Sequence, residues 1–228
     1  MKKIGVLLSG SGVYDGAEIH ESVFTLWAVE KHGGEWFCIA PNKKQFHVIN
    51  HLNGEELKEE RNVLIESARI ARGNIKDLKD VHASDMDALV LPGGFGTAKN
   101  FTNWAIKGPD GEIDADVKRI ILEMVQAKKP VGALCMSPTT VAKALEGSGI
   151  SVGLTIGNTT DKSLYDIAGI NAGMEKVGAK PMAVKPNDVY VDEANKIVTS
   201  PCYMMEVGIT TVAEGAEKVV AEIFKMLR

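Results

Sequence analysis

Short, uninterrupted apolar runs alternate with helical patterns along most of this chain, and that alternation limits the folds open to it. The apolar runs are Lys3–Leu8, Trp36–Ala40, Ala88–Leu91, Val131–Leu134, Val189–Val191 and Lys196–Thr199. Continuous apolar runs of this length are typical of strands buried on both faces of a sheet. Helical patterns between such strands predict an α/β fold, with a mostly parallel sheet and helices on both of its faces.

Three helical patterns carry apolar residues at the spacing of one helix face. Their apolar stripes are Ile19, Val23, Leu26 and Trp27; Val117, Ile120, Ile121 and Met124; and Ile209, Val212, Ala216, Val219, Val220 and Ile223. Acidic residues precede the second stripe and lysines follow it, which matches the helix dipole at both ends. The pair of runs between Val189 and Thr199 predicts a hairpin, and therefore one antiparallel element in the sheet.

The length of 228 residues suits one domain, and we expect a single domain over 1–228. The segment 42–80 is polar and carries one predicted helix, Asn62–Arg72. We interpret this segment as an insertion or an extended crossover beside the core.

Charge and cysteine content exclude several classes of protein. The net charge is −4 and no basic run exceeds a pair of lysines, so a nucleic-acid or anionic-membrane partner is not indicated. No segment approaches the roughly 18 uninterrupted apolar residues of a membrane span. The three cysteines are far apart and form no CxxC motif, which argues against a disulfide framework or a zinc site. Unpaired cysteines favour a reducing compartment, and we expect a cytoplasmic protein.

Cys135 directly follows the apolar run Val131–Leu134 and precedes a helix-compatible stretch, Thr139–Leu145. This is the layout of a nucleophile elbow, in which a reactive side chain lies on a sharp turn between a strand and a helix. The helix dipole would push a thiol at this place toward the thiolate. The alternative is an unreactive cysteine in the core, where free cysteines are common.

A glycine-rich loop, Gly10–Gly16, leads into a helix that begins near Glu21. Its spacing is GxGxxxG rather than GxGxxG, and the second strand ends without an acidic residue, so a dinucleotide site is disfavoured. Glu21 is expected close to the elbow, where its carboxyl would accept the thiol proton of Cys135 or share one with it. The alternative role for Glu21 is an acidic residue that complements the helix dipole.

A second loop, Leu91–Gly96, contains Gly93 and Gly94. Their backbone N–H groups, together with that of Met136, are candidates for stabilising an oxyanion. The alternative is a plain loop whose glycines only satisfy the backbone. Lys99 and Asn100 follow this loop and would touch a substrate or cap a short helix, Asn100–Ile106.

All five histidines precede Cys135, which disfavours an ordinary Cys-His-acid triad, since that architecture places its histidine after the nucleophile. His51 is a candidate cleft residue from the insertion, although a lone histidine is more often structural. Cys38 lies in a predicted strand and is expected to be inert. Cys202 ends the predicted hairpin and is expected near the surface.

Several long motifs in order resemble the ElbB family, in the ThiJ/PfpI branch of the class I glutamine-amidotransferase-like superfamily. They are Leu8–Glu21, Val48–Gly54, Arg61–Glu66, Pro92–Asn100 and Asp192–Thr199. The resemblance implies a flavodoxin-like three-layer sandwich with an elbow cysteine, which falls on Cys135, and with Glu21 as its acidic partner. It also implies a glutathione-independent glyoxalase that converts glyoxal, and other small 2-oxoaldehydes, to the hydroxy acid.

Such chemistry needs no cofactor and takes a small aldehyde as its partner, and we expect a homodimer. A third loop, Thr155–Thr160, follows these two, and related superfamily members often carry a histidine after it, near the place where this chain has Gly157-Asn158. That difference predicts slow turnover, because a general acid or base typically contributes about 10²–10⁴-fold. Two alternatives stay open: a non-catalytic stress or redox sensor that uses an oxidisable Cys135, and amide hydrolysis or ammonia transfer.

Overall fold

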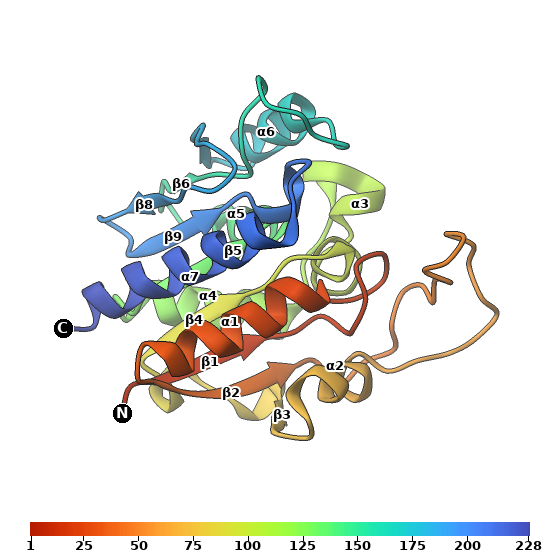
Figure 1. Ribbon diagram of the computed structural model, residues 1–228, viewed down its shortest axis with the longest axis horizontal. Helices are drawn as coiled ribbons and strands as arrows, with labels where there is room; N and C mark the ends of the chain where they lie inside the picture. Colours follow the sequence, from red (N-terminus) through yellow and green to blue (C-terminus); the bar gives the residue numbers. More distant parts are fainter.

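A seven-stranded sheet forms the middle layer of the computed structural model, which describes residues 1–228 (Figure 1). The strand order is β3-β2-β1-β4-β5-β9-β8. All neighbouring strands are parallel except β8 and β9, which form the predicted hairpin. The strands are β1 (Lys3–Leu7), β2 (Glu35–Ala40), β3 (Ile75–Asp77), β4 (Ala88–Leu91), β5 (Val131–Leu134), β8 (Tyr190–Asp192) and β9 (Ile197–Ser200). The mostly parallel sheet is therefore confirmed.

Helices cover both faces of this sheet and complete the predicted three-layer sandwich. Helix α1 (Ile19–Lys31) packs beside α7 (Ile209–Met226) in front of the sheet in Figure 1. Helices α4 (Ala115–Gln126) and α5 (Ser137–Leu145) pack together behind it. Helix α2 (Val63–Ala71) connects β2 to β3 and contacts α1.

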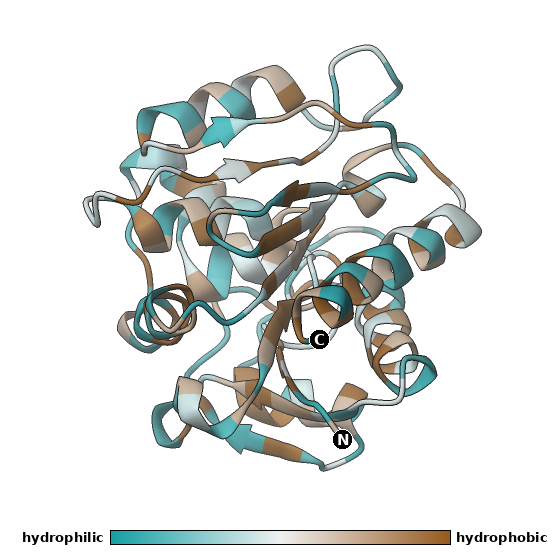
Figure 2. Ribbon diagram, turned by 90° about the vertical axis from the view of Figure 1, so that its left-hand side faces the viewer, coloured by the Kyte–Doolittle hydropathy of each residue, from teal (hydrophilic) through white to brown (hydrophobic).

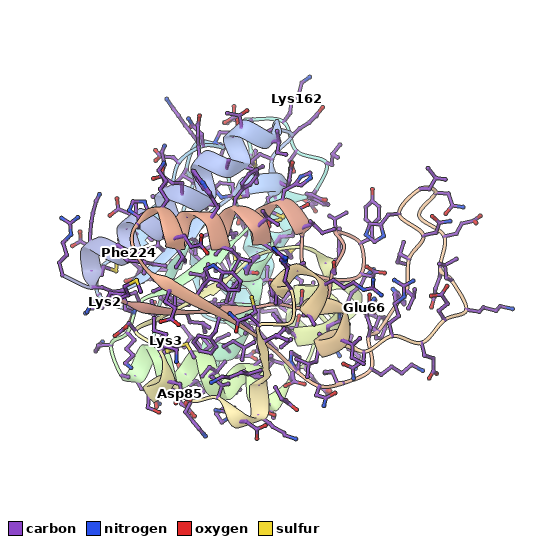
Figure 3. All side chains as sticks on the ribbon, turned by 60° about the horizontal axis from the view of Figure 1, so that its bottom comes forward. Lys2, Lys3, Glu66, Asp85, Lys162 and Phe224 are labelled. Atoms are coloured by element: carbon purple, nitrogen blue, oxygen red, sulfur yellow. The ribbon has the colours of Figure 1, made fainter.

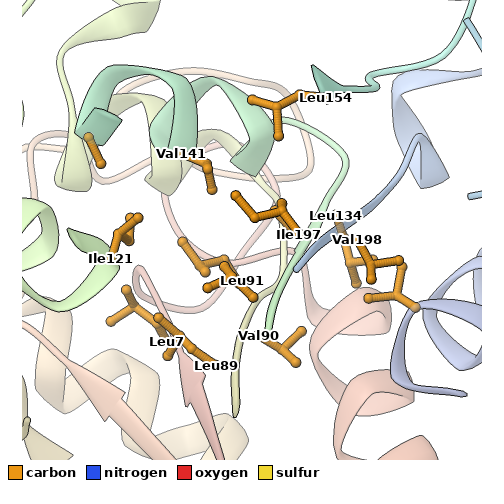
Figure 4. Packing of buried hydrophobic residues seen from close by; sticks show 14 of the residues in the cluster. Leu7, Leu89, Val90, Leu91, Ile121, Leu134, Val141, Leu154, Ile197 and Val198 are labelled. Carbon is orange, nitrogen blue, oxygen red and sulfur yellow. The ribbon is translucent and has the colours of Figure 1, made fainter. Parts of the chain in front are cut away.

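The core consists of the strands and the inner faces of the helices, and hydrophobic colour concentrates there in Figure 2. Figure 4 shows Leu89, Leu91 and Ile197 of β4 and β9 packed toward one another on one face of the sheet, with Val141 of α5 close by. Their side chains are fully buried, and each such aliphatic side chain contributes about 1.5–3 kcal/mol relative to an exposed one. This packing fixes the ends of β1, β4 and β5, from which the candidate site is built.

The first predicted helix forms, but three of the four residues of its apolar stripe face outward, and only Leu26 faces inward. Ile19, Val23 and Trp27 are 44–47% exposed. The buried face of α1 consists of Glu21, Ser22, Thr25, Leu26, Ala28 and Val29. The apolar periodicity predicts the wrong buried face for α1, because this helix buries the polar side chain of Glu21 and packs small residues against its neighbours.

The segment 42–80, interpreted as an insertion, divides into an arm and a part of the core. The arm, residues 42–62, has only isolated bridges such as Ile49–Glu56 and extends away from the sheet, as Figure 3 shows. Helix α2 follows, where Asn62 caps the first turn through Ile65 N–H and Arg72 ends the helix at a φ of 51°. The strand β3 then joins the sheet edge.

Some elements carry little sequence signal. Helix α6 (Ile167–Lys176) contains two glycines, and a two-stranded sheet of β6 (Gly153–Leu154) and β7 (Lys180–Pro181) flanks it. The predicted helix Asn100–Ile106 is wrong: a π-helical turn, Thr97–Phe101, precedes the short helix α3 (Trp104–Lys107). No helix combines the length and the apolar character needed to cross a membrane.

Candidate active site

The site lies where the strand order changes direction, between β1 and β4. Strand order runs one way from β1 to β2 and β3, and the other way through β4 and β5. Ligands in open α/β sheets bind in the crevice at the carboxyl ends of strands at such a point. Glu21, Gly93 and Cys135 come from the segments that follow β1, β4 and β5, and the fold brings these three residues together.

Cys135 forms the predicted nucleophile elbow. Its φ is 57°, in the left-handed region that a residue with a side chain seldom adopts. Its N–H donates to Ser200 O over 2.9 Å, which extends the pairing of β5 with β9 by one residue. Helix α5 begins two residues later, and Ser137 Oγ donates to Pro92 O over 2.6 Å. These bonds hold the turn in its strained conformation, directly below the Gly93 loop.

The carboxyl of Glu21 and the sulfur of Cys135 meet at Gly93, although they are far apart in sequence. A methyl group added to Gly93 would lie 2.6 Å from Glu21 Oε2 and 2.9 Å from Cys135 Sγ, and would also collide with Cys135 Cβ. Gly93 N–H donates to Glu21 Oε2 over 2.8 Å, and Tyr203 N–H donates to Oε1 over 3.3 Å. The absence of a side chain at Gly93 therefore leaves the space that the acid and the thiol share.

Burial sets the protonation of this pair. Glu21 is completely buried, and its burial, together with the charge of Glu18, raises the pKa of Glu21 to about 8. Burial and then the Glu21 charge raise the pKa of the Cys135 thiol well above its ordinary value, although Gly94 N–H donates to the sulfur. The expected push toward a thiolate by the helix dipole is therefore wrong, since desolvation outweighs it. At neutral pH the pair holds mainly an acid and a thiol.

The backbone N–H groups predicted for an oxyanion divide into two kinds. Gly93 N–H binds the Glu21 carboxyl, so it is not free for an oxyanion. Gly94 N–H faces the Cys135 sulfur, and Met136 N–H makes no hydrogen bond within the protein. Only the N–H groups of Gly94 and Met136 are therefore placed to stabilise a negatively charged oxygen on a substrate bound to Cys135.

The amide of Asn100 is occupied by the protein itself. Its Nδ2 donates to Ser9 O over 2.8 Å and to Asp15 O over 2.9 Å, and its Oδ1 accepts from Phe46 N–H over 2.9 Å. Asn100 is buried and joins the first glycine loop to the arm, which argues for a structural role rather than the predicted substrate contact.

The structure does not bring His51 to the Glu21–Cys135 pair. Its Nε2 accepts from Tyr14 N–H over 3.2 Å, its Nδ1 lies 3.0 Å from Ile49 O, and its ring stacks on Tyr14 at 4.9 Å between centroids. Both ring nitrogens thus bind backbone groups, and His51 ties the arm to the first glycine loop.

Glu18 is a functional candidate that the sequence did not reveal. It caps α1, and its Oε2 accepts the N–H of Glu21 over 2.7 Å. Its other oxygen lies 3.9 Å from His20 Nδ1, which in turn is 2.9 Å from the Tyr203 hydroxyl. Because glutamate is uncommon as a helix cap, a Glu three residues before Glu21 gave no usable signal.

Near the Glu21–Cys135 pair, the prediction for Cys202 is wrong, and Tyr165 was not predicted. Cys202 is fully buried rather than near the surface, with a φ of 45°, and burial raises the pKa of its thiol. Tyr165 packs its ring edge-on against Phe95, the residue after Gly94, with 5.8 Å between ring centroids. The only sequence feature that could have indicated Tyr165 as a site residue is its position after the third loop, beyond Asn158. No three His, Cys, Asp or Glu side chains lie together in a way that would hold a metal ion.

Comparison with curated proteins finds relatives that extend over nearly the whole chain. The rat ES1 protein homolog, mitochondrial, is 38% identical over 226 residues, which cover 98% of this chain and 84% of the relative. The human glutamine amidotransferase-like class 1 domain-containing protein 3, mitochondrial, is 38% identical over 98% of this chain and 83% of its own length. The zebrafish ES1 protein, mitochondrial, is 30% identical over 89% and 77%. No protein-family model matches.

Solved structures agree on the fold. A protein of Ehrlichia chaffeensis, titled an isoprenoid biosynthesis protein with an amidotransferase-like domain, covers both chains completely with a TM-score of 0.90 at 32% identity. Drosophila melanogaster DJ-1beta gives a TM-score of 0.53 at 16% identity over 99% of this chain and 95% of its own, and shows the fold alone.

The names of these relatives overturn one expectation. The rat, human and zebrafish proteins are named as mitochondrial, which contradicts the expected cytoplasmic location. The inference failed because unpaired cysteines indicate a reducing environment without identifying the compartment.

Proposed function

Because this chain belongs to the ES1 family of glutamine amidotransferase-like class 1 proteins, with a fold of the ThiJ/PfpI and DJ-1 type, we propose that it is a glutathione-independent glyoxalase. Its substrate would be glyoxal, and its product glycolate. The observation that carries this proposal is the Glu21 carboxyl beside the Cys135 thiol at a strained elbow. The substrate itself rests on the resemblance to the ElbB family.

The reaction begins with the ionised form of Glu21. The carboxylate takes the proton of the Cys135 thiol, and the sulfur attacks one aldehyde carbon of glyoxal. The C=O bond opens, and its oxygen takes negative charge beside the N–H groups of Gly94 and Met136. Glu21 then gives its proton to this oxygen, which leaves a hemithioacetal and a carboxylate again.

The hydrogen atom next moves between the two carbons of the substrate. Glu21 removes the proton from the carbon bound to sulfur, which gives an enediol, and returns it to the second carbon. Transfer of the hydroxyl proton to the second oxygen completes a thioester of glycolate on Cys135. Water cleaves the thioester to glycolate and restores the thiol. One carbon is oxidised and the other reduced, so the sequence needs no external oxidant, reductant or cofactor.

The protonation of the pair supports slow turnover. At neutral pH most Glu21 is protonated, since its pKa is about 8, and only the minority with a carboxylate starts the cycle. The same burial makes that carboxylate a stronger base than an exposed glutamate. A redox sensor is less well supported, because sensor cysteines are accessible thiols of low pKa, whereas Cys135 is buried and its pKa is raised.

Glycolate production from glyoxal, without glutathione, tests the proposal. Wild type and Cys38→Ala should both form glycolate, since Cys38 is buried in β2, where burial raises the pKa of its thiol to about 12. Cys135→Ala should form none, and a chelator should leave the rate unchanged. Glycolate formation by Cys135→Ala at the wild-type rate would overturn the role of the thiol. A wild type without any glycolate formation would favour a sensor or binding protein. The homodimer remains a separate prediction, which sedimentation measures.

A further inference from the structure

The hydroxyl of Tyr165 is a free hydrogen-bond donor close to the elbow. The polar contacts of Tyr165 are made through its backbone: its N–H donates to Ser163 Oγ over 2.9 Å, and its carbonyl accepts from Ile167 N–H over 3.0 Å. The hydroxyl makes no hydrogen bond within the protein. The ring is half-buried and packs edge-on against Phe95, which follows Gly94 of the Cys135 loop. Tyr165 also lines a cavity of about 260 Å³ together with other residues of the segment 158–168, none of which belongs to the elbow or to the Gly93 loop.

The segment that carries Tyr165 is held firmly against the other side of the site. Ser163 Oγ donates to Met204 O over 2.6 Å, and Glu206 N–H donates to Lys162 O over 2.8 Å. The neighbouring residue Tyr203 supplies the N–H that binds Glu21 Oε1. The position of the Tyr165 ring is therefore coupled to the same turn that orients the catalytic carboxyl.

Tyr165 keeps its proton at neutral pH. Burial, and then the nearby Cys135 and Tyr14, raise the pKa of Tyr165 to about 12. A tyrosine in this state donates a hydrogen bond without giving up its proton. It is thus suited to stabilise negative charge, whereas Glu21 is suited to move protons.

A 1,2-dicarbonyl carries two oxygens, and the elbow has donors for only one of them. Gly94 and Met136 N–H serve the oxygen on the carbon that Cys135 attacks. We propose that the Tyr165 hydroxyl donates a hydrogen bond to the second carbonyl oxygen of a dicarbonyl held on Cys135. Tyr165 is then a catalytic residue that selects 1,2-dicarbonyls over simple aldehydes. This inference rests on the proposed glyoxalase function.

The hydrogen bond strengthens as the reaction proceeds. When Glu21 removes the proton from the carbon bound to sulfur, the electron pair of that C–H bond forms the new C=C bond, and the π electrons of the second C=O bond move onto its oxygen. Negative charge grows on the atom that Tyr165 binds, and the tyrosine proton stays on its own oxygen. Removal of one such donor typically lowers kcat by about 10²–10³-fold.

Kinetics with glyoxal give the first test. Tyr165→Phe keeps the ring that packs on Phe95 and removes a hydroxyl without protein partners, so its melting temperature should match that of wild type. Its kcat/KM for glyoxal should fall about 10²-fold. Tyr190→Phe, on strand β8 against Gly153, is the matched control and should retain wild-type kinetics. An unchanged kcat/KM in Tyr165→Phe would overturn the proposal.

A second measurement does not require turnover. Aldehydes that add to Cys135 protect it from iodoacetamide, and mass spectrometry measures the labelled fraction. Glyoxal should protect wild type more strongly than Tyr165→Phe, whereas acetaldehyde, which has one oxygen, should protect both equally. Equal protection by glyoxal would overturn the role of Tyr165. If wild type forms no glycolate, the glyoxalase function fails, and the protection by glyoxal still decides whether Tyr165 binds the second oxygen.

Discussion

Glu18 Oε2 accepts the backbone N–H of Glu21 over 2.7 Å, so two carboxyl groups lie within one turn at the start of α1. Both side chains are buried, and burial raises the pKa of each. The charge of Glu18 raises the pKa of Glu21 further. The helix cap thus also controls how readily the Glu21 carboxyl loses its proton.

Glu18→Gln should lower the pKa of Glu21, because an amide oxygen keeps the cap while the negative charge is removed. The value should stay above that of an exposed glutamate, since burial is the larger cause. In glyoxal turnover, the rise of kcat/KM with pH, centred near pH 8 in wild type, should move to lower pH. A pH–rate profile measures this shift, with the exposed Glu214→Gln as the control. An unmoved profile would show that Glu18 only caps the helix.

The stability of the protein should fall as the pH rises toward 8. The folded-state pKa of Glu21 is about 8, above its ordinary value of 4.5, so the folded state binds more protons than the unfolded state between these values. The free energy of unfolding therefore decreases from about pH 4.5 to pH 8, by several kcal/mol in order of magnitude. Denaturant titrations at pH 5, 7 and 9 measure this slope.

Glu21→Gln should flatten that slope. Glutamine has one acceptor oxygen where the Glu21 carboxylate has two, so the bond from Gly93 or Tyr203 N–H is lost at a cost of about 1 kcal/mol. The comparison is thus between slopes and not between absolute stabilities. A Glu21→Gln protein that loses stability as steeply as wild type would place the titrating group elsewhere.

Gly93→Ala should lower turnover by about 10²-fold with little change in fold. The added methyl group would collide with Cys135 Cβ and lie 2.6 Å from Glu21 Oε2, so one of the two groups must move. A displacement of about 1 Å in a catalytic group can cost about 10²-fold in rate. The control is Gly208→Ala, since an added methyl group there meets nothing within 4 Å. Equal glycolate rates in both variants would contradict the shared space at Gly93.

The sequence predicted the fold where the signal was local. Buried runs such as Ala88–Leu91 became strands with the predicted bounds, and the turn at Cys135 followed from a strand and a helix meeting at one residue. Strand β3 was missed because a strand of three residues, two of them charged, carries a weak pattern. Helix α6 was missed because its glycines weaken the helical pattern. Tertiary contacts stabilise both elements.

The site was predictable only in part, for a different reason. Chain order and loop position alone predict that Cys135, Glu21 and the Gly93 loop lie close together. The protonation of the thiol depends on how much water reaches it and on the charge of Glu21, and neither quantity can be read from local sequence. Glu18 and Tyr165 likewise became candidates only through contacts between distant segments.

Glu21→Gln should change the reactivity of Cys135 and the turnover of glyoxal in opposite directions. Above pH 8 the Glu21 carboxylate in wild type raises the pKa of the Cys135 thiol, and a neutral glutamine removes that charge. Iodoacetamide should therefore label Cys135 faster in Glu21→Gln than in wild type at pH 9, while Cys38 and Cys202, which are fully buried, stay unlabelled in both. Glycolate formation should fall about 10²–10⁴-fold, since no group remains to carry the proton between the two carbons. Slower labelling together with slower turnover would mean that Glu21 acts chiefly by activating the thiol, and the proton transfer between carbons would then need another base.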